Sequence, residues 1–204
     1  MSQPQRSEKN ERNERTISAG ERSPAQMREG YTPMLEALHT AKSNETLASK
    51  LHLYGQFIGS WRLDIDMHAL DGSHRRTEGE VHFDWVLEGK AIQDVWIYPA
   101  RRFRTGEAPA ESWYQYGSTF RWYDPAIDAW HITWFDPNQA VELRQISRAV
   151  GDEIVQIGED HSGLLRRWRF VDITSESFTW VGEVSWDKGS TWKLETHMRA
   201  SKVS

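Results

Sequence analysis

Phe57-Ile58-Gly59-Ser60-Trp61 opens a run in which apolar and charged residues alternate. From Trp61 to Met67 every second residue is apolar, and the residues between them are charged. This period of two is typical of a strand with one buried face and one solvated face. Asp64, Asp66 and His68 share the charged face and could be taken for a metal cluster, but their regular alternation favours a solvated outer face.

The same alternation continues to the end of the chain. Turn signals of Gly, Asp and Pro separate successive runs, and apart from residues 99–112 the connections are short. Short connections imply antiparallel neighbours, and closing the sheet removes its costly edges. The sequence therefore predicts an all-β, roughly ten-stranded antiparallel up-and-down barrel. Its strands are expected at residues 60–69, 75–87, 91–98, 113–123, 129–136, 141–150, 153–159, 164–173, 177–186 and 191–202.

Two segments precede the predicted barrel of residues 57–204. Residues 1–30 are polar and charged with almost nothing apolar to bury, which predicts a disordered leader. Residues 31–56 predict short helices, the second of them with Leu47, Leu51 and Tyr54 on one stripe. This helical segment is expected either to plug or lid one end of the barrel or to pack against its wall.

Composition excludes several classes of partner. The 204 residues carry a net charge of −5, so no basic surface for nucleic acid or an anionic membrane is expected. No apolar run is long enough to span a membrane as a helix, and no signal peptide is recognisable. The chain has no cysteine, which excludes disulfides and thiol chemistry. A cytoplasmic location is predicted, and the oligomeric state is left open.

The turn at Glu88-Gly89 decides which way Asp94 points. A two-residue turn pairs Trp85 with Ile92 and Phe83 with Asp94, so that one carboxylate stands on an otherwise apolar inner face. A three-residue turn would instead turn the neighbouring Gln93 inward. The first register is favoured.

Two later hairpins are expected to add aromatic side chains to the inner face. Pairing Tyr123 with Ala129 places one set inside, and a three-residue loop at Asp187-Lys188-Gly189 places a second set there. Part of these aromatics is expected to form ordinary core. The first set is Tyr116, Ser118, Phe120, Trp122, Trp130, Ile132 and Trp134, and the second is Phe178, Trp180, Val184, Trp192, Leu194 and Met198.

Phe57-Ile58-Gly59-Ser60-Trp61 resembles the Gly-x-Trp opening of the calycins, the superfamily of lipocalins and fatty-acid-binding proteins. The segment Trp85-Val86-Leu87-Glu88-Gly89-Lys90-Ala91-Ile92 is similar to the second hairpin of bacterial lipocalin-like domains of unknown function, of the DUF1579-like kind. The likeness covers about residues 57–202. It implies a ligand-binding barrel, and the missing lipocalin cysteines and secretion signal suggest an intracellular relative.

The resemblance also implies roles for three residues. In calycins the opening Trp packs at the closed end beneath an Arg from the last strand, which makes Trp61 and Arg199 structural candidates. Nitrobindins, which are intracellular ten-stranded calycins, hold haem through one histidine, and His197 is the corresponding candidate. Arg62-Leu63-Asp64 replaces the glycines that follow Gly-x-Trp in nitrobindins, so the favoured prediction is no cofactor.

Asp94 is the sharpest candidate for chemistry. Burial on an apolar wall would raise the pKa of this carboxyl unless an Arg or a hydroxyl compensates, and it would then orient a ligand or act as a general acid or base. The alternative is a carboxylate already satisfied by a Tyr, a Trp N–H or an Arg. Three arginines are available for this purpose: Arg121, Arg167 and Arg169.

Three polar side chains bear on whether the barrel is an enzyme. His82, Asp84 and His131 are expected on the outer face; with the faces reversed they would enter the lumen and favour catalysis. The sequence contains no nucleophile elbow, phosphate-binding Gly loop or metal-binding helix, so no catalytic residue is assigned.

The favoured function is binding of a small apolar or aromatic molecule inside the barrel. The competing prediction is a cofactor-independent enzyme, such as an isomerase, cyclase, hydratase or decarboxylase, acting on a small metabolite in the same cavity. A third interpretation is a solidly packed scaffold without a cavity. The predicted ligand-binding residues are Asp94, Trp85, Trp96, Tyr116, Phe120, Trp134 and Trp180.

Overall fold

The computed structural model describes residues 32–69, 71–104 and 114–203. The chain divides into two units, Met1–Glu36 and Ala37–Ser204, and the first described helix is α2 (Pro33–Leu38). The predicted leader of residues 1–30 lies outside the described residues. Among the described helices, none has the length and apolar character needed to cross a membrane.

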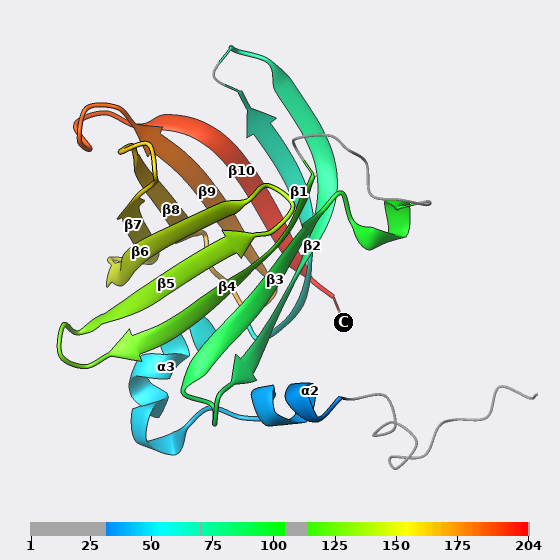
Figure 1. Ribbon diagram of the computed structural model, residues 1–204, viewed down its shortest axis with the longest axis vertical. Coiled ribbons are helices and arrows are strands. Elements are labelled where there is room, and N and C mark those ends of the chain that lie inside the picture. The colour runs from blue at the N-terminus through cyan, green and yellow to red at the C-terminus, as the bar shows by residue number, and fades with distance from the viewer. Residues whose placement is uncertain (1–31, 70, 105–113, 204) are drawn as a thin grey trace, which may run out of the picture. The chain divides into compact units, whose positions relative to one another are not determined.

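The second unit is a closed barrel of ten antiparallel strands, as predicted (Figure 1). Each strand pairs with its neighbours in sequence, and β1 pairs with β10 to close the sheet. The strands are β1 (Gly59–His68), β2 (His74–Val86), β3 (Ala91–Tyr98), β4 (Gln115–Asp124), β5 (Ala129–Asp136), β6 (Val141–Val150), β7 (Glu153–Glu159), β8 (Leu165–Val171), β9 (Ser177–Ser185) and β10 (Lys193–Lys202).

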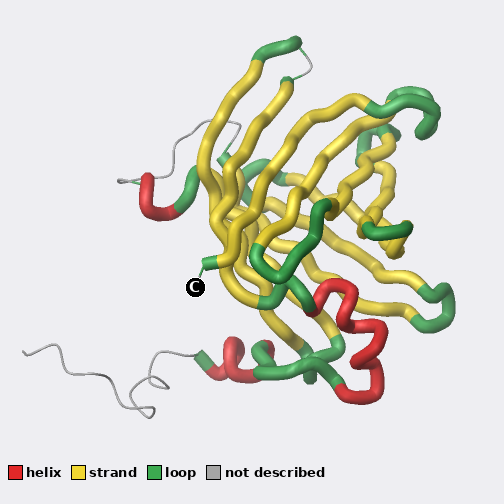
Figure 2. Tube along the Cα trace, turned by 180° about the vertical axis from the view of Figure 1, so that it is seen from behind, coloured by secondary structure: helices red, strands yellow, loops and turns green. Residues whose placement is uncertain are grey.

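Helix α3 (Ala48–Gly55) lies at one end of the barrel, after a short 3-10 turn, η1 (Glu45–Leu47), that the Asn44 side chain caps (Figures 1 and 2). Its buried stripe, Leu51 and Tyr54, belongs to the barrel core, as the helical spacing predicted. Because strands alternate in direction, the β2–β3, β4–β5, β6–β7 and β8–β9 turns gather at this end. The other connections, including η2 (Arg101–Phe103), gather at the opposite end.

The end of the barrel next to α3 is filled with aromatic rings. Phe57 packs against Phe170 in a tilted arrangement and against Phe178 edge-on, at centroid distances of 4.8 and 4.9 Å, and Tyr54 packs edge-on against Trp130 at 4.9 Å. Trp61 meets Phe178 at 4.9 Å. These rings leave the opposite half of the barrel as the place for a cavity.

The β2–β3 register is the one favoured from the sequence. Phe83 pairs with Asp94 and Trp85 pairs with Ile92, so that Asp94 faces the barrel interior. Leu87, Glu88 and Gly89 all have positive φ in the turn, which is the backbone that a tight antiparallel hairpin needs.

The predicted β4–β5 register is wrong by one residue. Asp124, not Tyr123, pairs with Ala129, and the Asp124 carboxylate caps the turn by accepting a hydrogen bond from the backbone N–H of Ala126 at 2.9 Å. A slip of one residue reverses the faces of a strand. The correction therefore moves Tyr116, Ser118, Phe120 and Trp122 to the outer face of β4 and turns Gly117, Thr119, Arg121 and Tyr123 inward.

The β9–β10 hairpin is confirmed in part. Trp180 pairs with Met198 on the inner face, as expected, and Phe178 is buried beside them in the core. The connection is longer than the three residues predicted, and a β-bulge shifts the register between Leu194 and Thr196. Leu194 therefore pairs with Glu183 and is exposed, instead of sharing the inner face.

Candidate functional site

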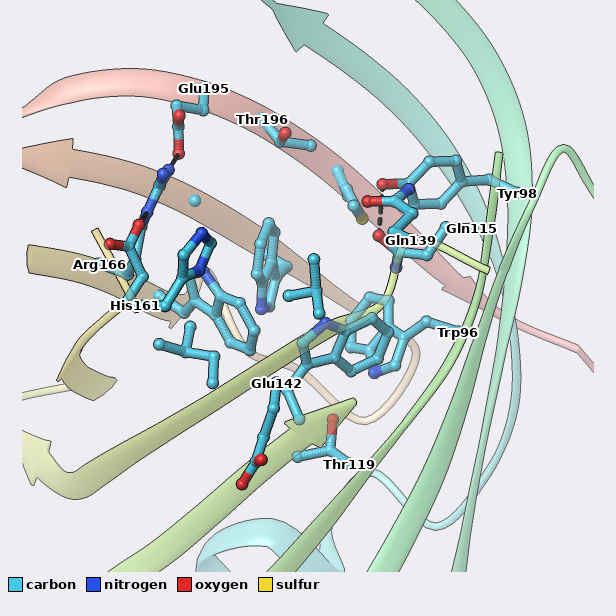
Figure 3. A pocket seen from close by; sticks show the side chains of 18 of the residues that line it. Trp96, Tyr98, Gln115, Thr119, Gln139, Glu142, His161, Arg166, Glu195 and Thr196 are labelled. Atoms are coloured by element: carbon cyan, nitrogen blue, oxygen red, sulfur yellow. Dashed lines mark hydrogen bonds and ion pairs between the residues drawn. The ribbon is translucent and has the colours of Figure 1, made fainter. Parts of the chain in front are cut away.

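A cavity of about 310 Å³ occupies the end of the barrel opposite α3. Its volume lies at the lower end of the range for small-molecule sites and argues against a solidly packed scaffold. Figure 3 shows Arg166, His161 and Glu195 on one side of the cavity and Tyr98, Gln115 and Gln139 on the other.

Four tryptophans that line the cavity form a continuous aromatic belt across the lumen. Trp96 on β3 meets Trp180 on β9 at 5.8 Å between ring centroids, although these strands are not neighbours in the sheet. Trp180 meets Trp168 at 5.4 Å, and Trp168 meets Trp134 on β5 at 6.1 Å with nearly perpendicular planes. We call Trp96, Trp134, Trp168 and Trp180 the tryptophan belt.

Two glycines let belt indoles lie close to the barrel wall. A Cβ added at Gly182 would lie 2.7 Å from the Trp180 ring, and one added at Gly117 would collide with the Trp134 ring. A side chain at either position would push an indole into the lumen. Gly117 and Gly182 therefore help to keep the cavity open.

Arg121 and Asp94 form a buried ion pair beneath the belt. The exposed fraction of the side chain is 0% for Asp94 and 1% for Arg121, and Arg121 lines the cavity. Asp94 Oδ1 also accepts hydrogen bonds from the Trp96 indole N–H at 2.8 Å and from the backbone N–H of Thr119 at 3.1 Å. Asp94 is thus satisfied by an Arg and a Trp N–H, the alternative that the sequence left open.

The Arg121 guanidinium is held at the boundary between the core and the cavity. It lies 5.1 Å from the Tyr54 ring centroid and 5.9 Å from that of Phe170, within the range of cation–π attraction. Burial lowers the pKa of Arg121 to about 10, while the nearby Tyr54 opposes this shift. Arg121 therefore stays protonated at neutral pH and its charge is balanced by Asp94.

A second ion-pair group stands at the cavity mouth. Arg166 on β8 donates from Nε to the Asp160 carboxylate at 2.7 Å and from Nη1 to Glu195 on β10. Burial alone would raise the pKa of Asp160, but hydrogen bonds from Ser162 and Arg166 outweigh it and lower the pKa to about 2. Arg166 therefore ties the β7–β8 turn to β10 across the rim.

The Asp160–Arg166 pair predicts a contribution to stability that depends on pH. Because the pKa of Asp160 falls from about 4 when unfolded to about 2 when folded, the carboxylate stabilises the fold at neutral pH by up to ~2 kcal/mol. This contribution is complete above about pH 4 and is lost as the pH falls through about 2. The Asp160→Asn variant should accordingly be less stable than the wild type at pH 7, with a difference that shrinks in acid.

Urea unfolding of the wild type and of Asp160→Asn from about pH 7 down to about pH 2 checks this expectation. Asp152→Asn, a substitution at an exposed carboxylate in the β6–β7 turn, is the matched control and should match the wild type throughout. A difference between Asp160→Asn and the wild type that did not change with pH would contradict the predicted contribution of the Asp160 carboxylate to stability.

The predicted ligand-binding residues divide into three groups. Trp96, Trp134 and Trp180 line the cavity. Asp94 contacts three lining residues from behind, as described above. The remaining three do not reach the cavity: Tyr116 and Phe120 point outward because of the β4 register, with Tyr116 41% exposed, and the Trp85 ring lies against Gly55 of α3 at the opposite end.

Sequence reasoning missed the cavity positions of Arg121, Thr119, Trp168 and Arg166. A signal for Arg121 was present, because a lone Asp94 on an inner face needs a cation, and Arg121 was one of three named candidates. The other two, Arg167 and Arg169, lie on the outer face, where both pair with Glu183.

The residues implied by the calycin resemblance are placed as follows. Trp61 is fully buried in the core, and Arg199 faces outward opposite Asp64. The cation over the Trp61 ring is Lys202, with Nζ 5.4 Å from the ring centroid. His197 pairs with Asp66 on the outer face, so this side chain does not fit a haem bound inside the cavity.

The other polar candidates also lie on the outer face. His82 contacts Ser60 and Glu80, and His131 contacts Asp124 and stacks on Trp122. Asp84 pairs with His39. The faces are therefore not reversed at these positions, and these three residues supply no acid or base to the lumen.

Comparison with solved structures places the barrel among known folds. Rv2717c from M. tuberculosis is 10% identical, with a TM-score of 0.51 over 76% of this chain and 98% of its own. The S-type phycobiliprotein lyase CPES from Guillardia theta is 9% identical, with a TM-score of 0.50 over 79% of this chain and 99% of its own. The chain has a calycin-like fold. At these identities the likeness concerns the fold alone.

No protein-family model matches the sequence, and no curated protein matches it. The DUF1579-like assignment therefore stays a prediction. The assignment of a calycin-like fold rests on the closed ten-stranded barrel and on the similarity to the two structures above.

Proposed function

We propose that this protein binds a small aromatic molecule inside its calycin-like barrel. The observation that carries the proposal is the tryptophan belt, four indoles that line one cavity of about 310 Å³. Aromatic side chains offer large, rigid contact surfaces, and offset or edge-on ring contacts contribute about 0.5–1.5 kcal/mol beyond the area that they bury.

The fold similarity supports the same proposal in a general way. An S-type phycobiliprotein lyase has a similar barrel fold, which is consistent with small-molecule binding by a barrel of this kind. The proposal for this chain rests on its own cavity, since fold alone does not determine function.

The charged groups around the cavity favour binding over catalysis. Arg121 is paired with Asp94, and Arg166 is paired with Asp160 and Glu195. An enzyme acting on the same ligand would need an acid and a base free to exchange protons across the lumen. Among the described lining residues, Glu142 is paired with Arg144, and the exposed His161 at the rim takes part in none of these ion pairs.

Native mass spectrometry of the protein from its own host tests the proposal first, together with an absorption spectrum. A bound organic molecule that absorbs as an aromatic compound supports binding. If the mass of this molecule is unchanged after incubation with the protein, the result supports a carrier over an enzyme. A different product mass would favour the cofactor-independent enzyme. Equilibrium dialysis with 2-ethylnaphthalene then measures the aromatic affinity of the emptied barrel.

Trp168→Leu is expected to weaken 2-ethylnaphthalene binding by roughly three- to tenfold, because it removes one ring from the belt. The matched control is Trp186→Leu, at an exposed tryptophan in the β9–β10 connection, which should bind as the wild type does. Equal affinity of both variants would show that the probe does not occupy the belt.

A further inference from the structure

We propose that the ligand is an uncharged aromatic carbonyl compound, such as an aryl ketone or a ring lactam, whose oxygen is bound by Arg121 and Thr119. The inference rests on the proposed function and names the chemical class that the same cavity selects. It follows from which polar atoms around the cavity are satisfied and which are not.

Apart from Arg121 Nη1, which faces Asp94 Oδ2 in the ion pair, two buried donors that border the cavity have no hydrogen-bond acceptor among the described residues. They are Nε of Arg121 and the hydroxyl Oγ1 of Thr119, and both residues are 1% exposed. A buried polar group without a hydrogen-bond partner costs more free energy than a typical hydrogen bond contributes, so such groups are rare in native structures. Gln145 and Gln156 also have unpartnered amide atoms, but Arg121 and Thr119 are distinguished by lining the cavity.

The two donors lie close together in the fold. Thr119 and Arg121 are two residues apart on the inward face of β4, and Asp94 binds both of them, through the Thr119 backbone N–H and the Arg121 guanidinium. Asp94 thereby fixes the positions from which a ligand would be recognised. It acts as a positioning residue behind the site.

The chemistry of these atoms calls for an acceptor on the ligand. A guanidinium has only donors, and a threonine hydroxyl donates one hydrogen. A carbonyl oxygen has two lone pairs and can accept from both at once. A hydroxyl oxygen could also accept from these donors, but it would bring a hydrogen that needs an acceptor of its own, whereas a carbonyl oxygen brings none.

The charge balance favours a neutral acceptor over a carboxylate. Asp94 already neutralises Arg121, so an anion placed there would be a net buried charge without a counter-ion. At the mouth, Arg166 is matched by two carboxylates, those of Asp160 and Glu195, which adds negative charge on the path into the barrel. The carboxylate of an aromatic acid would be repelled by the acidic residues at the cavity mouth and would lose its hydration beside Arg121 without gaining a counter-ion.

Three probes with the same ring system separate the contributions of the ring, of the carbonyl oxygen and of a negative charge to binding: 2-ethylnaphthalene, 2-acetylnaphthalene and 2-naphthoate. In equilibrium dialysis at pH 7 the ketone is expected to bind about tenfold more tightly than the hydrocarbon, because it satisfies both donors. The carboxylate is expected to bind at least about tenfold more weakly than the ketone.

The Thr119→Val variant tests the donor itself with almost no change of shape. It should weaken 2-acetylnaphthalene binding by about fivefold and leave 2-ethylnaphthalene binding unchanged. Thr179→Val, the same substitution on the outer face of β9, is the control and should change neither affinity.

The outcomes distinguish this inference from the function on which it rests. If none of the three probes binds, aromatic binding itself fails. If the ketone and the hydrocarbon bind equally well, or if 2-naphthoate binds most tightly, the barrel binds aromatics but the uncharged carbonyl class is wrong. Loss of 2-ethylnaphthalene binding in Thr119→Val would likewise assign Thr119 to packing rather than to recognition.

Discussion

Arg121→Leu is expected to lower the free energy of unfolding by about 3–5 kcal/mol, because it leaves the Asp94 carboxylate as an uncompensated charge in the interior. The side chain of Asp94 is 0% exposed, so water cannot replace the lost cation. Urea unfolding measures this loss of stability, and the m-value should be the same as that of the wild type.

Two further variants show whether the loss comes from the buried charge. The double variant Asp94→Asn/Arg121→Leu should regain most of the stability, since the amide oxygen can still accept from Trp96 and from the Thr119 backbone. Arg167→Leu removes an arginine that is 24% exposed and pairs with Glu183 on the outer face; because Arg169 still pairs with Glu183, the change should cost no more than about 1 kcal/mol. If Arg121→Leu cost as little as Arg167→Leu, the ion pair would not exist as described.

Trp61→Ala is expected to destabilise the barrel by about 3–5 kcal/mol through the cavity that it creates. The Trp61 ring is fully buried, packs on Phe178 and donates its indole N–H to the carbonyl oxygen of Phe57 at 2.7 Å. It lies in the aromatic core next to α3 and outside the tryptophan belt. Affinity for 2-acetylnaphthalene should therefore stay within about twofold of the wild type at temperatures where the variant is folded.

The matched control for this core substitution is Trp186→Ala. This tryptophan is 51% exposed, so its removal should change stability by no more than about 0.5 kcal/mol. A Trp61→Ala variant that kept its stability and lost the probe would overturn the structural role of Trp61 and place it in the site.

The strands and their inner faces could largely be predicted from residue patterns. The alternation around Trp61 determines which side of β1 is buried. Glu88-Gly89 is typical of a tight turn, and the register that this turn sets placed Asp94 on the inner face. Short connections between all segments except the third and fourth then favoured closure of the sheet.

The faces of β4 could not be predicted from the residue pattern. Both of its faces carry large or polar residues, and the more apolar one, with Phe120 and Trp122, is the outer one. The residue that overrides the pattern is Arg121, drawn inward by Asp94 on the adjacent strand. The hydrophobic pattern of β4 alone cannot predict that Arg121 points inward, because this orientation depends on an ion pair with a residue on another strand.

The sequence by itself determined a closed all-β barrel with Trp61 in its core and Asp94 on an inner wall, because a period of two is a local property of each strand. Only the tertiary structure decided that Trp96 meets Trp180, that Trp134 meets Trp168, and that Arg121 neutralises Asp94. Those contacts depend on the length of each turn, which sets the register to within one residue, and on closure of the sheet, which brings distant strands face to face across the lumen.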